Sequence, residues 1–283
     1  MNSLEALILG LIQGLTEFLP VSSSGHLMIG KALLGVEVTE DLVFEVTVHA
    51  ATVLATLVVF RKAIRGYLKD LLPVRVDGRL RFVYNDGVDY LLKIGVSMIP
   101  VFVVGVFFKD AVTALFSSMT VVGCCLIVTS VLLFLSDRPL SFRRAGAEKA
   151  SGKPAGAPRG GISYLQAFVV GIGQSVAVLP GLSRSGTTIS TGLLCGVRRD
   201  VMAQFSFLMV LVPILGETFL DVVGGDMAAS AVGVLPLLIG FVAAFFSGLF
   251  ACRVMIALVR RAQLKWFGLY CALAGLLVLI FLA

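Results

Sequence analysis

Long apolar stretches alternate with short polar segments along this chain. Apolar runs of roughly 15 to 25 residues recur at 90–108, 121–135, 235–258 and 266–283. A bilayer core about 30 Å thick requires helical runs of about this length, whereas a β-barrel shows short alternating segments. The pattern predicts six spanning helices, at about 44–60, 88–108, 119–136, 203–222, 233–258 and 266–283. We therefore expect an all-α polytopic membrane protein, with one integral membrane domain over residues 1–283.

Two apolar segments near the N-terminus, 4–19 and 27–36, are too short to cross a bilayer comfortably. Their pattern returns later, because residues 4–54 align without gaps on 165–215. The matches include polar residues and glycines, namely Gln13/Gln174, Ser22/Ser183, Ser24/Ser185, Gly10/Gly171 and Gly25/Gly186. Short, interrupted segments at corresponding places in two halves are typical of re-entrant helices that meet at a binding site. We expect two re-entrant helix pairs within repeats at about 4–60 and 165–222.

The basic residues predict how these repeats are oriented. They cluster in 61–81, 138–159 and 260–265, and the positive-inside rule places such loops in the cytoplasm. We therefore expect cytoplasmic basic loops at about 61–87 and 137–161. The first helix pair then enters from outside and the second from the cytoplasm, so the repeats are inverted. The charges that follow each pair agree, except for Lys31: they are Glu37, Glu40 and Asp41 in one copy, and Arg198 and Arg199 in the other.

The composition excludes several classes of protein. The chain is 58% hydrophobic and 14% charged, and a soluble domain carries about 25% charged residues. The net charge of +6 comes from the loops, so no nucleic-acid partner is expected. No basic residue precedes Lys31, which argues against a cleavable signal peptide. The five cysteines lie in apolar segments without metal-ligand spacing and are interpreted as packing residues.

Gln13 and Glu17 are the first candidate site residues. They lie four residues apart, so they share one face of a helix. A carboxylate at membrane depth faces the protein interior or a water-filled cavity and marks a functional site. Glu17 is therefore predicted to be a general base, a ligand of a divalent cation, or both. The alternative is a carboxylate that only reaches out to the membrane interface.

The stretch from Pro20 to His26 predicts an anion site. Pro20 ends the first short helix, and Ser22, Ser23 and Ser24 suit the N-cap of the next. A helix N-terminus offers free backbone N–H groups to an anion. His26 can act as an acid or base near neutral pH, and Ser23 is a candidate nucleophile within its reach. The alternative is that the serines only cap the helix and His26 only packs.

The second copy supplies a cation to the predicted site. Arg184 occupies the position of Ser23, and Thr187 that of His26. A guanidinium suits phosphate, although a purely structural pair with Glu17 is the alternative. Two facing helix N-termini beside Arg184 predict phosphoryl transfer from a substrate whose other end stays in lipid. The substrate-binding candidates are Gln13, Ser22, Ser24, Gly25, Ser183, Ser185, Gly186 and Thr187.

Four further acidic or imidazole side chains are candidates from later segments. Glu45 and His49 form another pair spaced by four residues, which either lines the pocket or marks the membrane interface. Glu217 and Asp221 lie towards the outer end of their predicted helix.

The chain resembles a known family through two long motifs. "QGLTEFLPVSSSGH" and "PGLSRSG" are similar to the motifs of the undecaprenyl-diphosphate phosphatases, also called bacitracin-resistance proteins. The likeness covers nearly the whole chain, including "FEV" at 44–46 and "FSF" at 205–207. It implies hydrolysis of undecaprenyl diphosphate to the monophosphate and phosphate, which recycles the lipid carrier for cell-wall polymers. It also implies a bacterial inner-membrane protein whose site opens to the outer face and is aided by Mg²⁺ or Ca²⁺.

The resemblance assigns expected roles to residues of this chain. The family's E/Q-x-x-x-E motif corresponds to Gln13 and Glu17, so Gln13 leaves one carboxylate for a metal. The other two motifs correspond to Pro20, Ser22, Ser23, Gly25 and His26, and to Pro180, Gly181, Ser183, Arg184, Ser185 and Gly186. The expected catalytic residues are Glu17, Ser23, His26 and Arg184. The nucleophile is either Ser23, with His26 as its proton partner, or a water.

Two other functions are possible alternatives for such a sequence. The acid-phosphatase-like lipid phosphatases need a second histidine after an S-R motif, and "SRSGTTIS" has none. A transporter or flippase of a polyprenyl phosphate lipid stays the alternative, since broken inverted repeats are also a transporter architecture. Phosphate release distinguishes it from the phosphatase. The sequence permits a homodimer without determining the oligomeric state.

Overall fold

In the computed structural model, the described residues are 1–36, 42–72, 74–76, 79–81, 84–116, 118–137, 161–224, 232–261 and 263–283. The helices are α1 (Ser3–Phe18), α2 (Ser23–Leu34), α3 (Leu42–Asp70), α4 (Asp86–Phe107), α5 (Lys109–Leu115), α6 (Met119–Asp137), α8 (Tyr164–Val176), α9 (Arg184–Leu194), α10 (Arg199–Gly224), α11 (Val234–Arg260) and α12 (Leu264–Phe281). One antiparallel hairpin pairs β1 (Val74–Val76) with β2 (Arg79–Arg81).

Six helices of the described part are long and apolar enough to cross a membrane: α3, α4, α6, α10, α11 and α12. They confirm the predicted spans and the all-helical multi-pass fold. The β1–β2 hairpin departs from the all-α expectation. Its segments, Val-Arg-Val and Arg-Leu-Arg, alternate apolar and basic residues, as strands often do. The sequence-based expectation of a basic loop considered only the charge of this region.

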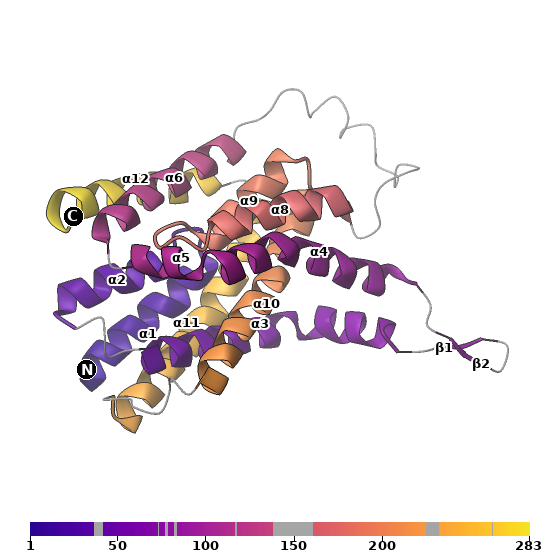
Figure 1. The fold of residues 1–283 in the computed structure, drawn as a ribbon, viewed down its shortest axis with the longest axis horizontal. Helices are drawn as coiled ribbons and strands as arrows, with labels where there is room; N and C mark the ends of the chain where they lie inside the picture. Colours follow the sequence, from indigo (N-terminus) through magenta and orange to yellow (C-terminus); the bar gives the residue numbers. More distant parts are fainter. Residues whose placement is uncertain are drawn as a thin grey trace.

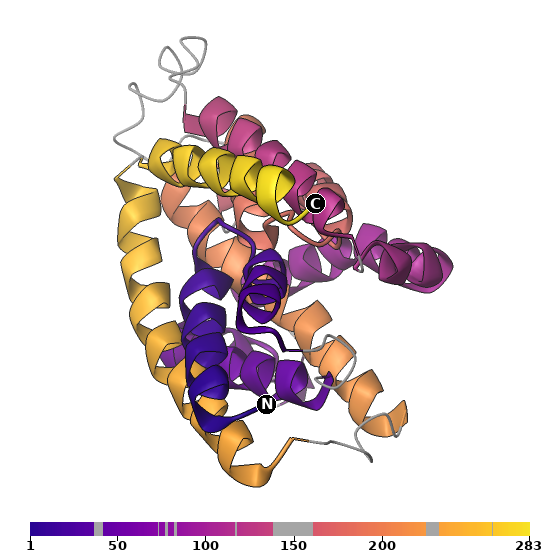
Figure 2. The ribbon, with the colours of Figure 1, turned by 90° about the vertical axis from the view of Figure 1, so that its left-hand side faces the viewer.

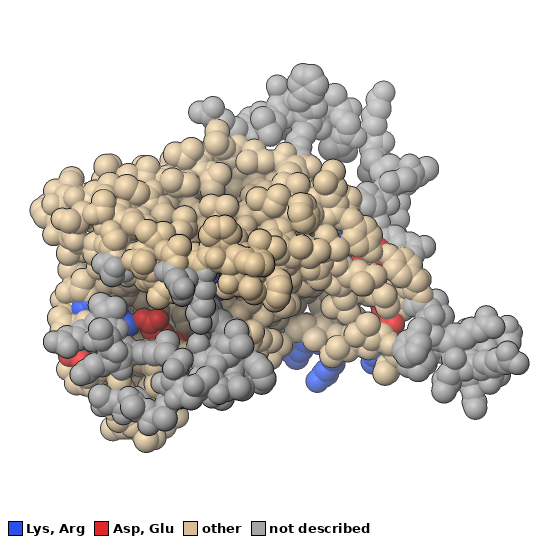
Figure 3. Space-filling model, viewed as in Figure 1, with Lys and Arg blue, Asp and Glu red and all other residues tan. Residues whose placement is uncertain are grey.

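The long helix α3 also differs from its predicted span. It was expected to end near residue 60, but it continues to Asp70, into the predicted basic loop. Residues 61–70 contain no proline, and Arg, Lys, Ala and Leu are good helix formers, so the helix continues as a charged extension. The exposed basic side chains on it are Arg61, Lys62, Arg65 and Lys69. Figure 1 places this end of α3 beside the hairpin, on the side of the molecule opposite the N-terminus, and Figure 3 shows basic side chains along the lower edge, to the left of the hairpin.

Several predictions about charge fall beyond the described residues. Most of the expected loop at 137–161 lies there, because residues 138–160 are not described. Glu37, Glu40 and Asp41 lie there too, as do the side chains of Glu217 and Asp221. The charge contrast between the two repeats stays a prediction.

Four short helices occupy the places that the repeated pattern predicted. Helices α1 and α8 even begin alike, because each starts with a capping box at matched positions. Asn2 and Glu5 form the first box, and Ser163 and Gln166 form the second. Each box satisfies backbone donors that the first helical turn leaves free. That the two pairs re-enter the bilayer from opposite sides stays a prediction.

Matched glycines let each pair approach a long helix closely. Helix α1 packs on α11, and α8 packs on α4. A Cβ at Gly10 would lie 2.5 Å from the carbonyl oxygen of Gly240, and one at Gly171 would lie 2.2 Å from that of Ser97. Small residues allow such close backbone contact between membrane helices. Gly10 and Gly171, which match in the sequence repeat, therefore have the same packing role.

The hydrophobic core surrounds the point where the short helices meet. Phe18 and Val21, at the α1–α2 junction, belong to the same core cluster as Ile189 of α9 and Phe207 of α10. Figure 2 shows α1 and α2 enclosed by the longer helices, with α11 on one side and α12 across one end. This arrangement places the polar ends of α1, α2 and α9 deep inside the molecule.

Candidate active site

Glu17 lies in the last turn of α1, with its side chain only 7% exposed. Its Oε2 atom accepts a hydrogen bond from Gln13 Nε2 at 2.9 Å and from Ser23 Oγ at 2.6 Å. The prediction that Gln13 and Glu17 share one face of a helix is confirmed, and the two side chains also hydrogen-bond. The closest hydroxyl contact of Ser23 is thus the carboxylate of Glu17.

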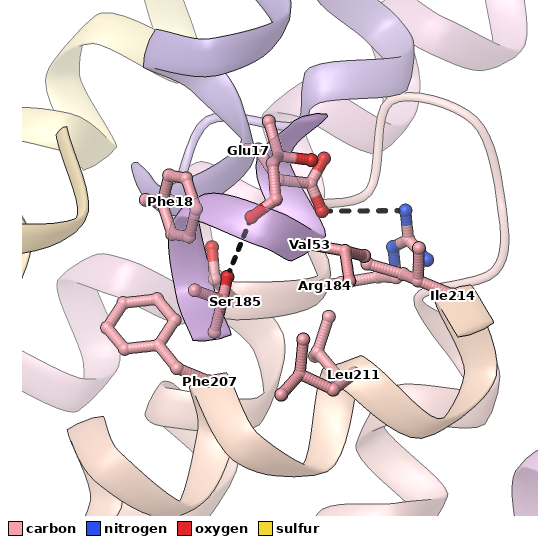
Figure 4. Close-up of a pocket in the computed structure, with 11 residues that line it drawn as sticks. Glu17, Phe18, Val53, Arg184, Ser185, Phe207, Leu211 and Ile214 are labelled. Carbon is pink, nitrogen blue, oxygen red and sulfur yellow. Dashed lines mark hydrogen bonds and ion pairs between the residues drawn. The ribbon is translucent and has the colours of Figure 1, made fainter. Parts of the chain in front are cut away.

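Two potentially cationic groups face the same carboxylate. Arg184 Nη2 lies 3.7 Å from Glu17 Oε1, as Figure 4 shows, and His49 Nε2 lies 3.9 Å from Oε2. Arg184 begins α9, and His49 lies on α3, so three separate segments converge on one group. The expected meeting of the first and second repeats at Glu17 and Arg184 is confirmed.

His49 belongs to this cluster. Its predicted partner, Glu45, contacts His49 through the backbone carbonyl and not through the carboxylate. The Nδ1 atom of His49 donates to the backbone carbonyl of Glu45 at 2.8 Å, which leaves Nε2 facing Glu17. The Glu45 carboxylate instead accepts from Lys31 Nζ at 2.5 Å, and Lys31 is almost completely buried. The structure thus places His49 beside Glu17, and Glu45 in an ion pair that joins α2 to α3.

The N-termini of α2 and α9 are capped in the same way. Ser22 Oγ accepts from the backbone N–H of Gly25 at 3.3 Å, and Ser183 Oγ accepts from that of Gly186 at 3.0 Å. Ser22 has a φ of 72°, the one positive value among the described non-glycine residues. Such a backbone conformation is unfavourable and concentrates at functional sites.

The two capped loops touch each other. Ser185 Oγ donates to the carbonyl oxygen of Leu19 at 3.2 Å, and a Cβ at Gly25 would lie 3.0 Å from the Cα of Gly181. The two helix N-termini therefore lie next to one another, as the repeat predicted. Between them lies a polar hollow of about 220 Å³, lined by Thr16, Glu17, Ser22, Ser23, Ser24, Leu182, Ser183, Arg184 and Ser185. Its serine hydroxyls, helix N-termini and guanidinium suit an anion.

His26 makes contacts that the sequence did not anticipate. Its Nδ1 atom donates to the carbonyl oxygen of Ser22 at 2.8 Å, so Nε2 accepts from the Tyr270 hydroxyl at 2.7 Å. The two rings also stack, with centroids 5.5 Å apart. Ser23 therefore hydrogen-bonds to Glu17 instead of His26 in this state, and a catalytic role of His26 stays a prediction. Tyr270 lies in an otherwise apolar stretch of the sequence. Its hydroxyl was the only signal there that could have marked it as a candidate site residue.

The residues present fit a divalent cation that the substrate helps to bind. Mg²⁺ and Ca²⁺ prefer oxygen ligands, and Mg²⁺ often uses one or two protein groups together with substrate phosphates and waters. Gln13 donates to Glu17 through Nε2, and its buried Oε1 has no hydrogen-bond partner among the described residues, so this oxygen is available as a ligand. No group of three or more His, Cys, Asp or Glu side chains in the described residues is placed to hold a metal. A complete coordination shell would therefore need oxygens from the substrate.

The second pair contains polar groups without a comparable cluster. Gln174 is the counterpart of Gln13, and neither polar atom of its buried amide has a hydrogen-bond partner in the described structure. Thr187 is the counterpart of His26, and its buried Oγ1 also lacks a partner there. The Thr187 hydroxyl therefore makes no hydrogen bond to the other predicted substrate-binding residues within the described structure, although the backbone N–H of Thr187 donates to the carbonyl oxygen of Ser183 at 2.8 Å.

Comparisons with known proteins identify the family to which the chain is similar. Residues 6–277 match the family model described as bacitracin resistance protein BacA. A protein of Bacteroides thetaiotaomicron named undecaprenyl-diphosphatase is 48% identical, with 99% of both chains covered. Proteins of the same name from Parabacteroides distasonis and Methanococcus vannielii are 47% and 35% identical, covering 99% of this chain and 98% and 100% of theirs.

Proposed function

The chain belongs to the bacitracin resistance protein BacA family, and we propose that it hydrolyses undecaprenyl diphosphate to undecaprenyl phosphate and phosphate. Relatives that carry the name undecaprenyl-diphosphatase match over almost the full chain. The observation that carries the proposal is the convergence of Glu17, Ser23 and Arg184. A base, a hydroxyl and a guanidinium meet in one polar hollow between two helix N-termini. These are the groups that nucleophilic attack on a phosphorus atom requires.

The substrate's diphosphate would occupy the hollow between α2 and α9. Its negative charge meets the backbone N–H groups of both helix N-termini and the guanidinium of Arg184. The Arg184–Glu17 separation of 3.7 Å is longer than a charge-assisted hydrogen bond, so the guanidinium retains donors for phosphate oxygens. The contact between Arg184 and Glu17 therefore leaves Arg184 able to bind the anion.

Glu17 is the proposed general base for Ser23. The Ser23 hydroxyl already donates to Glu17 Oε2 at 2.6 Å, which is the path along which its proton would leave. Ser23 Oγ bonds to the terminal phosphorus, the bond from that phosphorus to the bridging oxygen breaks, and undecaprenyl phosphate leaves. A water then attacks the phosphoserine, Glu17 returns its proton to Ser23 Oγ, and the water's proton goes to the released phosphate.

A divalent cation is part of the proposal. Glu17 and Gln13 Oε1 would hold it, because they supply a carboxylate and a free amide oxygen on one helix face. When bound, the cation offsets the negative charge of the diphosphate. Gln13 would thus serve both by donating to Glu17 and by ligating the cation, which the amide's two ends permit.

The proposed location is the bacterial inner membrane, with the site open to the outer face. The exposed basic residues on the extension of α3 support a cytoplasmic position for that end. The N-terminal end of α1 lies at the other end of the molecule (Figure 1), where the N-terminus would face outward. A diphosphate lipid left in the outer leaflet would then reach the hollow from that side.

The test is phosphate release from undecaprenyl diphosphate by the purified protein in detergent. We expect release that a chelator abolishes, and losses of about a hundredfold or more for Glu17→Gln and Ser23→Ala, the range for acid–base and nucleophilic groups. A phosphorylated Ser23, trapped at low pH and located by mass spectrometry, would identify the nucleophile. Ser23→Ala with near-wild-type activity would instead assign the attack to a water. Lipid binding without release would favour a transporter.

A further inference from the structure

The imidazole of His49 faces the Glu17 carboxylate, and the proposed reaction gives it no role. Its Nε2 atom lies 3.9 Å from Glu17 Oε2. This separation is too long for a hydrogen bond, which joins nitrogen and oxygen at about 2.7–3.2 Å. Arg184 approaches the other carboxylate oxygen, Oε1, at 3.7 Å. The guanidinium and the imidazole therefore approach different oxygens of one carboxylate, and neither forms a close ion pair with it.

The backbone of α3 fixes the orientation of this imidazole. His49 Nδ1 donates to the backbone carbonyl oxygen of Glu45 at 2.8 Å. In a neutral imidazole this bond leaves the lone pair on Nε2, which is the atom that faces Glu17. Histidines that bind metal ions almost always donate their second ring nitrogen in this way. The Glu45 carboxylate is held in turn by Lys31 of α2, at 2.5 Å, so the first turn of α3 is anchored.

The lone pair of His49 and the carboxylate oxygen of Glu17 are both electron donors, so a cation between them would bind to both. Two metal–ligand bonds of about 2.0–2.2 Å each are long enough together to reach across 3.9 Å. Glu17 is also supported as ligating carboxylates usually are, because Gln13 Nε2 and Ser23 Oγ donate to it. Gln13 Oε1, which has no hydrogen-bond partner among the described residues, is a further oxygen at the same place.

We propose that His49 Nε2 binds the divalent cation of this site together with Glu17 and Gln13, and that the site therefore prefers a transition-metal ion such as Mn²⁺ to Mg²⁺ or Ca²⁺. This inference rests on the proposed function, because it assigns a further ligand to the cation of the same reaction. Imidazole nitrogen suits transition-metal ions, whereas Mg²⁺ and Ca²⁺ take oxygen ligands. One carboxylate, one amide and one imidazole leave positions for waters or phosphate oxygens.

The test is pulsed electron paramagnetic resonance of Mn²⁺ bound to the full chain, prepared without a histidine tag. The samples contain Mn²⁺ alone or Mn²⁺ with methylenediphosphonate, a non-hydrolysable diphosphate. We expect the echo modulation of a directly bound imidazole nitrogen in the wild type, and its loss in His49→Gln. The chain has only two histidines, so His26→Gln is the matched control. That variant should keep the modulation, because His26 Nε2 contacts the Tyr270 hydroxyl instead.

The affinity for metal ions gives a second readout. The signal of free Mn²⁺ measures its Kd, and competition with Mg²⁺ measures the preference between the two ions. We expect His49→Gln to weaken Mn²⁺ binding about tenfold or more, on the scale of changes around a metal site. Mg²⁺ binding should change less than that of Mn²⁺, because the glutamine oxygen suits Mg²⁺ as well as it suits Mn²⁺.

Isotope labelling tests the ligand without any substitution, which covers the case that His49→Gln does not fold. In protein labelled with ¹⁵N-histidine, the ¹⁴N modulation should be replaced by that of ¹⁵N. Modulation that is absent from both wild-type samples, persists in folded His49→Gln, or disappears in folded His26→Gln would overturn the inference.

Phosphate release separates this inference from the proposed function. Nitrogen modulation from His49 in a protein that releases no phosphate from undecaprenyl diphosphate would reject the phosphatase and keep the metal ligand. Metal-dependent phosphate release without this modulation would keep the phosphatase and reject His49 as a ligand.

Discussion

Helices α1 and α2 begin and meet as α8 and α9 do, but the two pairs carry different chemical groups. Both α1 and α8 start with a capping box, and both α2 and α9 use a serine to cap the backbone of a matched glycine. At the position of Glu17 the second pair has Val178, and at the position of Ser23 it has Arg184. In the proposed mechanism, one pair thus supplies the base and the hydroxyl, and the other supplies the cation.

This comparison teaches that the repeat preserves helix capping and close glycine packing more than the chemistry of the site. Capping and close glycine contacts depend on local backbone positions, so both copies need them. A diphosphate needs groups of opposite roles around it, so the two copies can differ wherever side chains point into the shared hollow. The amide of Gln174 illustrates this: it has no hydrogen-bond partner among the described residues, and Val178 offers it no carboxylate where Glu17 binds Gln13.

The largest expected effect comes from replacing the proposed general base, Glu17, by the residue type found at the matched position of the second pair. Glu17→Val should lower kcat/KM for undecaprenyl diphosphate by about a thousandfold, within the range for loss of a general base. Phosphate release measures it, and Val178→Ala, the matched control in the second pair, should stay close to wild type. A decrease of less than tenfold for Glu17→Val would remove the carboxylate from the mechanism.

The converse change removes the cation from the second pair. Arg184→Ser should lower kcat/KM by about a hundredfold or more, because a preorganised donor to the developing phosphate charge is lost. Arg184→Lys should recover part of this, since an ammonium keeps the charge without the planar fork. Steady-state rates over a range of substrate concentrations measure both. Equal activity of the lysine and serine variants would show that charge at this position is unimportant.

The matched glycines should respond alike in stability. Gly10→Ala and Gly171→Ala each place a Cβ within 2.5 Å of a backbone oxygen, and such overpacking costs about 1–3 kcal/mol. The midpoint of thermal unfolding in detergent, followed by circular dichroism, should fall for both. Gly95→Ala is the control, because a Cβ there meets nothing within 4 Å. A decrease for only one of the matched pair would break the structural equivalence of the repeats.

The contact of His26 with Tyr270 has no counterpart in the second pair, where Thr187 replaces the histidine. Tyr270→Phe keeps the ring and removes the hydroxyl that donates to Nε2. If this bond orients His26 for the reaction, kcat should fall by about tenfold with KM nearly constant, on the scale of one hydrogen bond. An unchanged kcat, measured by phosphate release, would mean that the contact only packs α12 against α2.

The smallest expected effects distinguish the two glutamines. Gln174→Leu should leave activity within about threefold and stability equal or slightly raised, because it removes an unpaired buried amide. Gln13→Leu should reduce activity, since Gln13 donates to Glu17. The same phosphate assay and unfolding midpoints measure both variants. An activity loss for Gln174→Leu as large as that for Gln13→Leu would assign the second amide to the site.

The sequence by itself determined the class of fold and most of the site's members. Six spans followed from the length of apolar runs, because a bilayer imposes that length directly. The repeat indicated that the ends of two short helix pairs meet, and the motifs supplied Glu17, Ser23 and Arg184. These signals are local or periodic, so one sequence displays them. The length of α3 and the β1–β2 hairpin were missed, because charge in a connecting segment obscured their helical and strand patterns.

Only the tertiary structure decided which groups contact which. It placed His49 of α3 beside Glu17, directed Glu45 to Lys31, and paired His26 with Tyr270, 244 residues later in the chain. It also created a second, mostly apolar cavity beside the polar hollow, lined by residues of α1, α3, α9 and α10. These outcomes depend on how helices distant in sequence pack against each other. The spacing of residues within one helix cannot specify them, because it fixes a face but not the neighbour which that face meets.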